Sequence, residues 1–317
     1  MKILFPSTNR VHQARQQILL KELSKFFEVD VRDYRSPYTD ILGTTANIAD
    51  YFKGILLNNE YDLVLIRGDR FEMLPIAMMA SYKGLRIAHL EGGDLSGAID
   101  NKVRKAITAL ADIHFSTNKE SFTRLIGMGT DPDWTFNFGS LDVEYAASID
   151  NTKLWDEDYV VMCHHAMPGE YPAVIENIIR EEFKGKVVVI KSNSDNGTPY
   201  GTEEFHNTDY INLIAHAKCL VGNSSSFLKE ASIYGTPVVN IGERQRSRLR
   251  PHNVRDVPFE EYQIRHTIKM QLSAKYQPSF AYYQENTSLK IVDKIGEFLK
   301  IKYAMPEKDL TRVPEVI

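Results

Sequence analysis

The sequence predicts an α/β fold with two domains, each built around a parallel β-sheet. Short runs rich in Val, Ile and Leu alternate with segments of helical spacing along most of the 317 residues, a pattern typical of parallel sheets covered by helices. The alternation loosens around residues 140–155 and then resumes. Two alternating sets with one irregular segment between them indicate two domains, and a chain of this length can form a hydrophobic core in each.

The first alternating set occupies residues 1–150, which we expect to form the N-terminal domain. Its apolar runs are continuous, which is typical of strands buried on both faces of a parallel sheet. We expect these strands at residues 1–7, 62–67, 86–90, 112–117 and 135–139. Helical spacing predicts helices at residues 11–26, 101–111 and 118–129.

The second set occupies residues 151–285, which we expect to form the C-terminal domain. Strands are expected at residues 159–163, 187–192, 219–222 and 237–242. Helices are expected at residues 173–182, 209–216 and 227–234. Residues 286–317 begin with an amphipathic helix, which we expect to pack back across the domain junction, and they end in a tail to which the pattern assigns no element.

Composition narrows the class of protein. Lys and Arg number 38 against 42 Asp and Glu, a net charge of −4, so no basic excess indicates a nucleic-acid partner, although a local basic patch stays compatible with one. No apolar run is long enough to span a bilayer, and the first residues do not resemble a signal peptide. Cys163 and Cys219 fall in strand-like segments and are expected to be buried free thiols. We therefore expect a cytoplasmic protein with no membrane association.

Charged residues follow two of the expected strands at the point where each strand ends. Asp69 and Arg70 follow the expected strand at residues 62–67. Glu91, Asp94 and Asp100 follow the expected strand at residues 86–90. Ligands bind parallel sheets outside the carboxyl ends of the strands, and so much charge is costly to bury without a purpose. The sequence therefore predicts an active site at this edge.

A second group of polar residues follows the expected strand at residues 159–163. A single histidine at a strand end is more often structural, but His164 and His165 stand together at the edge where ligands bind, which favours a site role. A zinc site is not expected, because no further His or Cys falls at ligand spacing.

A third group follows the expected strand at residues 219–222 and consists of Asn223 and three serines. Serines that open a helix can simply cap its free N–H groups, and the same geometry can bind a phosphate; the local sequence leaves both interpretations open. Glu230 would lie about two turns into that helix, on the face that carries Phe227.

A run of arginines follows the expected strand at residues 237–242. Its members are Arg244, Arg246, Arg248, Arg250 and Arg255. Such runs are usually solvated surface, but this one lies at the ligand edge, where an arginine could reach a phosphate.

Several short segments, taken in this order, resemble the UDP-N-acetylglucosamine 2-epimerases. They are STNR, GDRFEML, HLEGGDLSGAID with VRKAIT, His164 after YVVMC, SNSDNG, GNSSSFLKEASIYGTPVVNIG and ERQRSRLRPHNV. Each is weak alone, but the ordered set spans residues 7–254 and is specific. The closer resemblance is to the hydrolysing branch, which releases N-acetylmannosamine and UDP for sialic-acid-type sugar synthesis.

The resemblance implies two Rossmann-like domains in a GT-B arrangement, with the active site in the interdomain cleft. It also implies a UDP-sugar substrate, a homo-oligomer (dimer or tetramer), and no metal or other cofactor. The implied catalytic set is Asp69, Glu91, Asp100 and His164. The implied substrate- and nucleotide-binding residues are Arg10, Arg70, Asn193, Ser224, Ser225, Glu230 and Arg248, with the two serines on the diphosphate and Glu230 on the ribose.

Four residues depart from the family pattern: His12, Lys105, His165 and Phe227. Phe227 replaces a glycine of the phosphate-binding turn and could crowd a pyrophosphate or reshape the sugar pocket. Between Asn193 and Asn223 the chain is also short by about one helix and one strand. We expect UDP-N-acetylglucosamine or a close N-acetylated relative as the substrate, and these departures leave a different sugar or nucleotide open.

The chemistry implied is loss of UDP and of the C-2 proton to give a glycal, followed by addition of water. It needs at least two proton-transfer groups in different protonation states, and clustered carboxylates raise one another's pKa. Two alternatives stay open. One is a GT-B glycosyltransferase that passes the sugar to an acceptor, and the other is a sugar-nucleotide-binding protein without catalysis.

Overall fold

A computed structural model describes residues 1–8, 10–37, 40–97, 100–192 and 200–300, and for residues 10–14 it describes the backbone alone. The described chain forms two compact units. The first unit contains residues up to Asp94, residues 100–141 and the chain from Glu285 onward. The second unit contains residues 142–284 together with the short segment that begins at Leu95.

The first unit is built on a six-stranded sheet in the order β2-β1-β3-β4-β5-β6, and every strand pair is parallel. The strands are β1 (Lys2–Ser7), β2 (Glu28–Asp33), β3 (Leu63–Arg67), β4 (Arg86–Leu90), β5 (Ile113–Ser116) and β6 (Thr135–Asn137). Because all run the same way, the residues that follow β3, β4 and β5 lie at one edge of the sheet.

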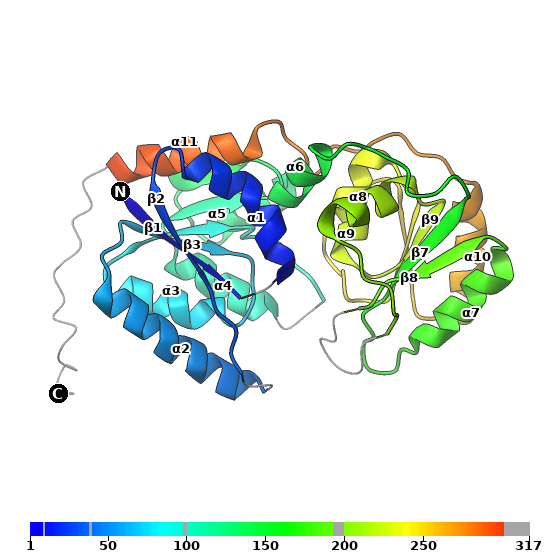
Figure 1. Cartoon of the computed structure of the whole chain (residues 1–317), viewed down its shortest axis with the longest axis horizontal. Helices are drawn as coiled ribbons and strands as arrows, with labels where there is room; N and C mark the ends of the chain where they lie inside the picture. Colours follow the sequence, from blue (N-terminus) through cyan, green and yellow to red (C-terminus); the bar gives the residue numbers. More distant parts are fainter. Residues whose placement is uncertain (9, 38–39, 98–99, 193–199, 301–317) are drawn as a thin grey trace. The chain divides into compact units, whose positions relative to one another are not determined.

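Helices cover both faces of the first sheet (Figure 1). They are α1 (Arg10–Leu23), α2 (Ile41–Asn58), α3 (Met73–Tyr82), α4 (Asp100–Leu110), α5 (Lys119–Gly127), the 3₁₀ turn η1 (Pro132–Trp134) and α11 (Thr287–Lys300). One face packs against α1 and α11, and the other packs against α2, α3 and α4. Side chains alternate between these cores along each strand, as Leu63 and Val64 do on β3.

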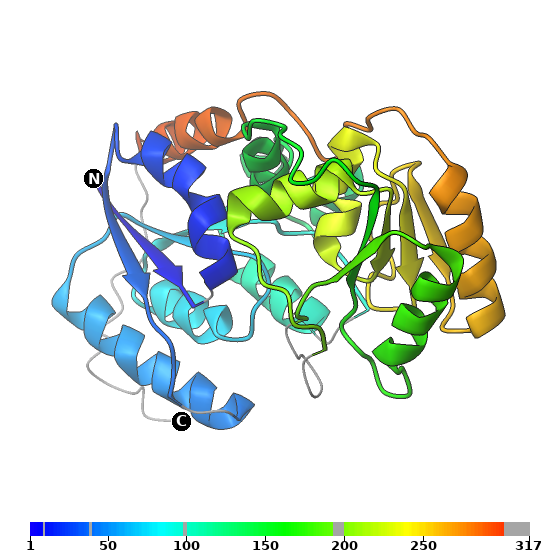
Figure 2. The same ribbon diagram turned by 45° about the vertical axis from the view of Figure 1, so that its right-hand side comes forward.

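The second unit is built on a five-stranded sheet in the order β11-β10-β9-β7-β8, again parallel throughout. Its strands are β7 (Tyr159–Cys163), β8 (Lys186–Val189), β9 (Cys219–Gly222), β10 (Val238–Ile241) and β11 (Val254–Val257). The sheet faces are covered by α8 (Asn207–His216) and α9 (Ser225–Leu228) on one side and by α7 (Pro172–Glu182) and α10 (Glu261–Ser273) on the other. Figure 2 shows α7 (green) and α10 (orange) on the same side of this sheet.

The α/β class with two parallel sheets is confirmed. The chain passes from the first unit to the second at the start of α6 (Leu141–Ala147), at the beginning of the irregular segment around residues 140–155, and it returns to the first unit at Glu285. The amphipathic helix α11 belongs to the first unit, where Thr287 donates a hydrogen bond to the carbonyl of Phe138. The last expected stretch, residues 301–317, lies outside the described residues.

Some elements carry no signal in the sequence pattern. Strand β2 reads EVDVRD and is partly exposed at the sheet edge, so it lacks the apolar run of a buried strand. The expected helix at residues 227–234 is wrong in detail: α9 ends at Leu228, and a 3₁₀ helix, η2 (Glu230–Tyr234), follows it. Cys163 and Cys219 are buried free thiols, as expected, and burial raises the pKa of Cys163 to about 11. Among the described residues no helix is long and apolar enough to cross a membrane.

Candidate active site

In the first unit, Asp69 follows β3, and its carboxylate forms an ion pair with Arg104 of α4. Arg104 is buried, whereas the Asp69 side chain keeps 24% of its surface exposed. Arg104 also donates to the carbonyl of Asp94, at 2.7 Å. The arginine therefore fixes Asp69 at the edge of the sheet while the carboxylate side chain stays partly exposed.

Glu91 follows β4 and is held in the same way by a second buried arginine. Nε and Nη2 of Arg67 donate to Glu91 Oε1 at 2.8 and 2.7 Å. The backbone of Glu91 has φ of 66°, a left-handed conformation that non-glycine residues adopt at a cost and that clusters at functional sites. Each of these two carboxylates thus has an arginine partner, whereas the sequence suggested carboxylates that act on one another.

His89 and Asp94, which accompany Glu91 in sequence, are structural. The carbonyl of Gly68 accepts from His89 Nε2 at 2.9 Å, and the Thr108 hydroxyl lies 3.1 Å from Nδ1. A carbonyl can only accept, so Nε2 carries the proton, and burial lowers the pKa of His89 to about 4. This neutral ring ties the end of β4 to the loop after β3.

Asp94 is buried and accepts hydrogen bonds from three side chains. They belong to Thr117, Asn118 and Ser121, near the start of α5. These hydrogen bonds fix the loop after β4 to the start of α5. We therefore assign Asp94 to anchoring the loop and not to proton transfer.

The remaining predicted residues of the first unit are Arg70, Asp100 and Arg10. Arg70 forms an ion pair with Glu72 at 2.7 Å, and Asp100 is the first residue of α4, one turn before Arg104 on the same side of the helix. Arg10 is the first residue of α1, and its side chain lies outside the described part.

In the second unit, the loops after β7 and β9 are locked together through Asn223. Its side chain accepts from the N–H of His165 at 2.7 Å and donates to the His165 carbonyl at 2.9 Å. The Asn223 carbonyl in turn accepts from Arg244 and Gln245 at 3.1 and 2.8 Å. Three strand ends, those of β7, β9 and β10, therefore form one hydrogen-bonded edge.

His164 lies on this edge with its side chain buried, and its Nε2 is 2.9 Å from Oε2 of Glu170. Sequence reasoning did not find Glu170, because the carboxylate lies six positions further along a loop with no periodic signal. It also did not assign roles to Arg67 and Arg104, although Arg104 falls within the VRKAIT segment.

The serine cluster is placed as expected at the end of β9. Ser224 is the N-cap residue of α9, yet its side chain makes no capping hydrogen bond. Helix capping therefore does not explain the hydroxyl at this position. Phe227 is fully buried in the core with α8, which argues against its crowding a pyrophosphate. Glu230 is also buried, in η2.

Some arginines of the run bind other groups of the protein, and others keep N–H donors that could bind a ligand. Arg244 binds the Asn223 carbonyl, Arg250 pairs with Asp256 at 2.8 Å, and Arg246 is 74% exposed. Within the described part of the chain, Nε and Nη1 of Arg248 are buried and make no hydrogen bond. Arg248 is therefore the member of the run with donors available for an anion.

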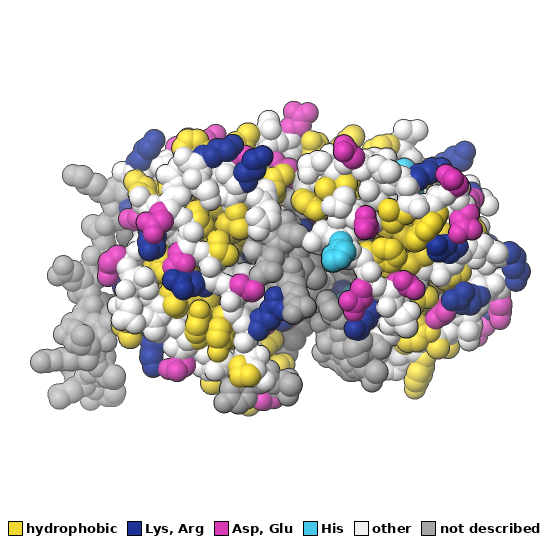
Figure 3. Space-filling view, viewed as in Figure 1, with side chains coloured by type: hydrophobic (Ala, Val, Ile, Leu, Met, Phe, Trp, Pro, Cys, Tyr) yellow, Lys and Arg dark blue, Asp and Glu magenta, His cyan; other side chains and the backbone are white. Residues whose placement is uncertain are grey.

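Asn193 lies outside the described residues. Across the parts that are described, no group of three or more His, Cys, Asp or Glu side chains could hold a metal ion. On the face drawn in Figure 3, basic and acidic side chains are interspersed.

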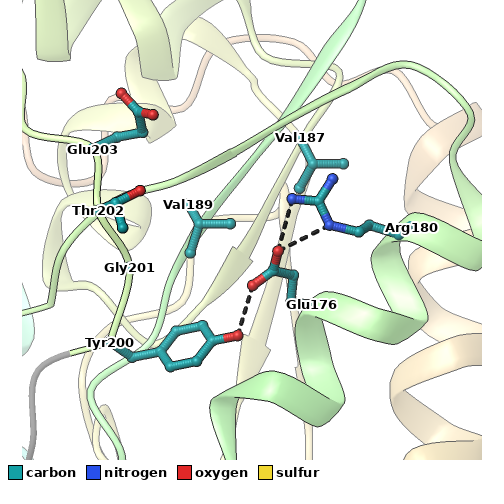
Figure 4. Close-up of a pocket in the computed structure, with 8 residues that line it drawn as sticks. All are labelled: Glu176, Arg180, Val187, Val189, Tyr200, Gly201, Thr202 and Glu203. Carbon is teal, nitrogen blue, oxygen red and sulfur yellow. Dashed lines mark hydrogen bonds and ion pairs between the residues drawn. The ribbon is translucent and has the colours of Figure 1, made fainter.

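A cavity of about 340 Å³ lies in the second unit, and none of the predicted site residues is among those that line it. Figure 4 shows it between the outer edge of β8 and residues 200–203, with Tyr200 donating to Glu176 at 2.6 Å and Glu176 paired with Arg180. Its polar groups already bind one another, so the catalytic interpretation stays with the strand ends.

Known proteins provide an independent comparison. A family profile described as UDP-N-acetylglucosamine 2-epimerase matches residues 14–296. The chain is 28% identical over 324 residues to the polysialic acid biosynthesis protein P7 of Escherichia coli, with 90% of this chain and 83% of that protein covered. It is 30% identical over 226 residues to the hydrolyzing UDP-N,N'-diacetylbacillosamine 2-epimerase of Legionella pneumophila, with 62% and 60% covered.

The fold is shared with a solved enzyme of the same kind. The crystal structure of UDP-GlcNAc 2-epimerase from Neisseria meningitidis bound to UDP-GlcNAc superimposes with a TM-score of 0.79 at 14% identity, covering 94% of this chain and 100% of that one. Two Rossmann-like sheets of the GT-B type are therefore shown for this chain. Together with the profile match over most of its length, they establish that the chain belongs to the UDP-N-acetylglucosamine 2-epimerase family.

Proposed function

We propose that this protein is a hydrolysing UDP-sugar 2-epimerase, which converts UDP-N-acetylglucosamine or a close N-acetylated relative to the 2-epimerised free sugar and UDP. The observation that carries the proposal is the pair of partly exposed carboxylates, Asp69 and Glu91, each held by a buried arginine at adjacent strand ends. Fixed carboxylates that keep a free face are suited to proton transfer.

The proposed reaction has two steps. In the first, a base takes the C-2 proton, the C-2 electron pair forms a C-1 to C-2 double bond, and the C-1 to oxygen bond breaks with its electrons leaving on UDP. In the second, the oxygen of water bonds to C-1 and a proton returns to the other face of C-2. We assign proton transfer to Asp69, Glu91, Asp100 and His164, which lie at strand or helix ends of the two units.

UDP is proposed to bind at the end of β9, near the Arg248 guanidinium, whose Nε and Nη1 are buried without a hydrogen-bond partner among the described residues. The Ser224 hydroxyl, which caps no N–H of α9, and its neighbour Ser225 are the proposed further donors. Such donors stabilise a leaving diphosphate. Arg10, Arg70, Asn193 and Glu230 complete the proposed set, and the enzyme is proposed to act in the cytoplasm as a homo-oligomer.

Hydrolysis is proposed because the Legionella relative, which is 30% identical, is a hydrolyzing enzyme. Incubation with UDP-N-acetylglucosamine, and separately with UDP-N,N'-diacetylbacillosamine, tests this by product analysis. Free 2-epimerised sugar with an equal amount of UDP is the expected result. An epimerised UDP-sugar would assign the non-hydrolysing reaction, and UDP release that needs an acceptor would assign glycosyl transfer.

Solvent deuterium tests the bond chemistry directly. In heavy water the proton returned to C-2 comes from exchangeable groups, so the product should carry deuterium at C-2, detected by NMR or mass spectrometry. Control incubations in ordinary water give the undeuterated mass. A product formed in heavy water with hydrogen at C-2 would contradict the epimerase proposal.

A further inference from the structure

We propose that Glu170 is a positioning residue for His164: it fixes the imidazole as the tautomer with hydrogen on Nε2, so that Nδ1 is the nitrogen that exchanges a proton during turnover. The inference rests on the proposed function for its catalytic meaning. It adds to that function a residue and a ring nitrogen that the motifs do not assign.

The first step in the argument is the contact between the two side chains. His164 Nε2 lies 2.9 Å from Glu170 Oε2, with the histidine side chain 0% and the glutamate side chain 10% exposed. The same oxygen accepts the N–H of Met167 at 2.9 Å. An ionised carboxylate only accepts hydrogen bonds, so the ring hydrogen must be on Nε2.

The carboxylate is held in its charged form by these donors. Burial acts to raise the pKa of Glu170, but the hydrogen bonds from His164 and Met167 outweigh it and hold that pKa below its ordinary value. A negative charge next to one ring nitrogen orients the imidazole and supports the positive charge that appears when the other nitrogen takes a proton.

The second step is the state of the other ring nitrogen. His164 Nδ1 is buried and has no hydrogen-bond partner among the described residues. Buried polar atoms without partners are rare and call for an explanation. With Nε2 protonated, Nδ1 presents a lone pair at the end of β7, on the strand-end edge locked by Asn223.

The third step is the space that the fold leaves for Glu170. Gly242, the residue after β10, has φ of +76°, and a Cβ there would lie 2.3 Å from Glu170 Oε1. Its N–H is bonded to the Val257 carbonyl at 2.9 Å, which fixes the backbone at this point. Only glycine therefore lets the carboxylate stand against this strand end and reach His164.

The test compares Glu170→Ala with Glu170→Gln in the full chain, using UDP release from UDP-N-acetylglucosamine. Removing the partner of a functional histidine typically costs about 10- to 100-fold. We expect Glu170→Ala to lower kcat by that factor, with KM and the Kd for UDP within about twofold of the wild type. Glu170→Gln keeps an oxygen acceptor but removes the negative charge, so it should recover only part of the kcat that Glu170→Ala loses.

The matched control is Glu182→Gln, which alters another largely buried, cation-paired carboxylate, at the far end of α7. It should leave kcat unchanged. A spectroscopic readout separates positioning from general destabilisation: ¹⁵N shifts of labelled His164 should show hydrogen on Nε2 in the wild type and a mixture of tautomers in Glu170→Ala. Should the alanine variant fail to fold, the wild-type ¹⁵N spectrum and the kinetics of Glu170→Gln still test whether Glu170 positions His164.

Wild-type kcat in Glu170→Ala, or a loss confined to KM or UDP affinity, would overturn the inference, as would hydrogen on Nδ1 in the wild type. Failure of the proposed function is distinguishable. In that case the wild type itself releases no UDP, while the ¹⁵N spectrum still reports whether Glu170 fixes the tautomer.

Discussion

At the scale of single residues, the buried arginines decide the electrostatics of the first unit. The sequence places Asp69 and Glu91 at one sheet edge, and the structure confirms that placement. Their partners, Arg104 and Arg67, are separated from them by 35 and 24 positions. No local pattern connects residues so far apart, so which charges meet could be read only from the folded chain.

Two buried histidines in the same sheet give a prediction about pH. His89 and His114 are paired across β4 and β5; burial lowers the pKa of His89 to about 4, and burial with the nearby His89 lowers that of His114 to about 3. The unfolded chain takes up these protons near pH 6.5 and the folded chain does not. Stability is therefore full above pH 6.5 and is lost as the pH falls toward 4, by about 1.4 kcal/mol per pH unit for each histidine.

Urea unfolding at pH values from 7 to 4.5 measures this slope. His89→Gln keeps an N–H donor for the Gly68 carbonyl and removes one titrating group. Its unfolding free energy should fall less steeply with acidification, by about 1.4 kcal/mol per pH unit. Equal slopes for the variant and the wild type would show that His89 titrates alike in both states.

At the scale of elements, continuous apolar strands were predictable and polar or interrupted elements were not. Strands β3 and β7 are buried along their whole length, and their continuous apolar runs predicted them correctly. Helix α2 was missed because Gly43, Thr44 and Thr45 weaken its first turns. It is held by burial of Ile48, Phe52 and Leu56, spaced four apart.

The burial of Phe227, on the short helix α9, gives a prediction about stability and UDP binding. Because the ring is buried in the core, Phe227→Ala should lower the unfolding free energy by about 3–5 kcal/mol, and it should not tighten UDP binding. Phe280→Ala, a matched change at a ring that is 62% exposed, should cost less than about 0.5 kcal/mol. Denaturant melts and UDP titrations measure both. Tighter UDP binding by Phe227→Ala would restore the crowding interpretation.

At the scale of the whole molecule, the family resemblance predicted more of the fold than the hydrophobic periodicity of the sequence did. Alternation predicted two sheets, and the amphipathic pattern after residue 286 predicted a helix that packs back across the domain junction, but neither assigned this helix to particular partners in the first unit. That assignment depends on distant packing, such as Phe298 against Trp134 at 4.9 Å between ring centroids. Long-range contacts of this kind leave only an amphipathic stripe in the local sequence.

Helix α11 therefore gives a prediction about which unit it stabilises. Ile295 is fully buried in the core that α11 shares with α1 and β1, so Ile295→Ala should cost about 2–5 kcal/mol. Hydrogen exchange should speed up in β1 and β3 and stay unchanged in β7 and β9. Ile268→Ala in α10 is the matched change and should give the reverse pattern. Faster exchange confined to the second unit in Ile295→Ala would contradict the assignment.

The return of α11 to the first unit also sets an order of events during synthesis. A ribosome makes the first unit's six strands early, yet the helix that closes one face of their core emerges only after the whole second unit. At about 5–20 residues per second, the roughly 150 residues between β6 and α11 leave the part of that face that α11 covers exposed for on the order of 10 s. During this interval the second unit can complete its core while the core of the first unit still lacks α11. A chaperone could bind the apolar surface of the first unit before α11 covers it.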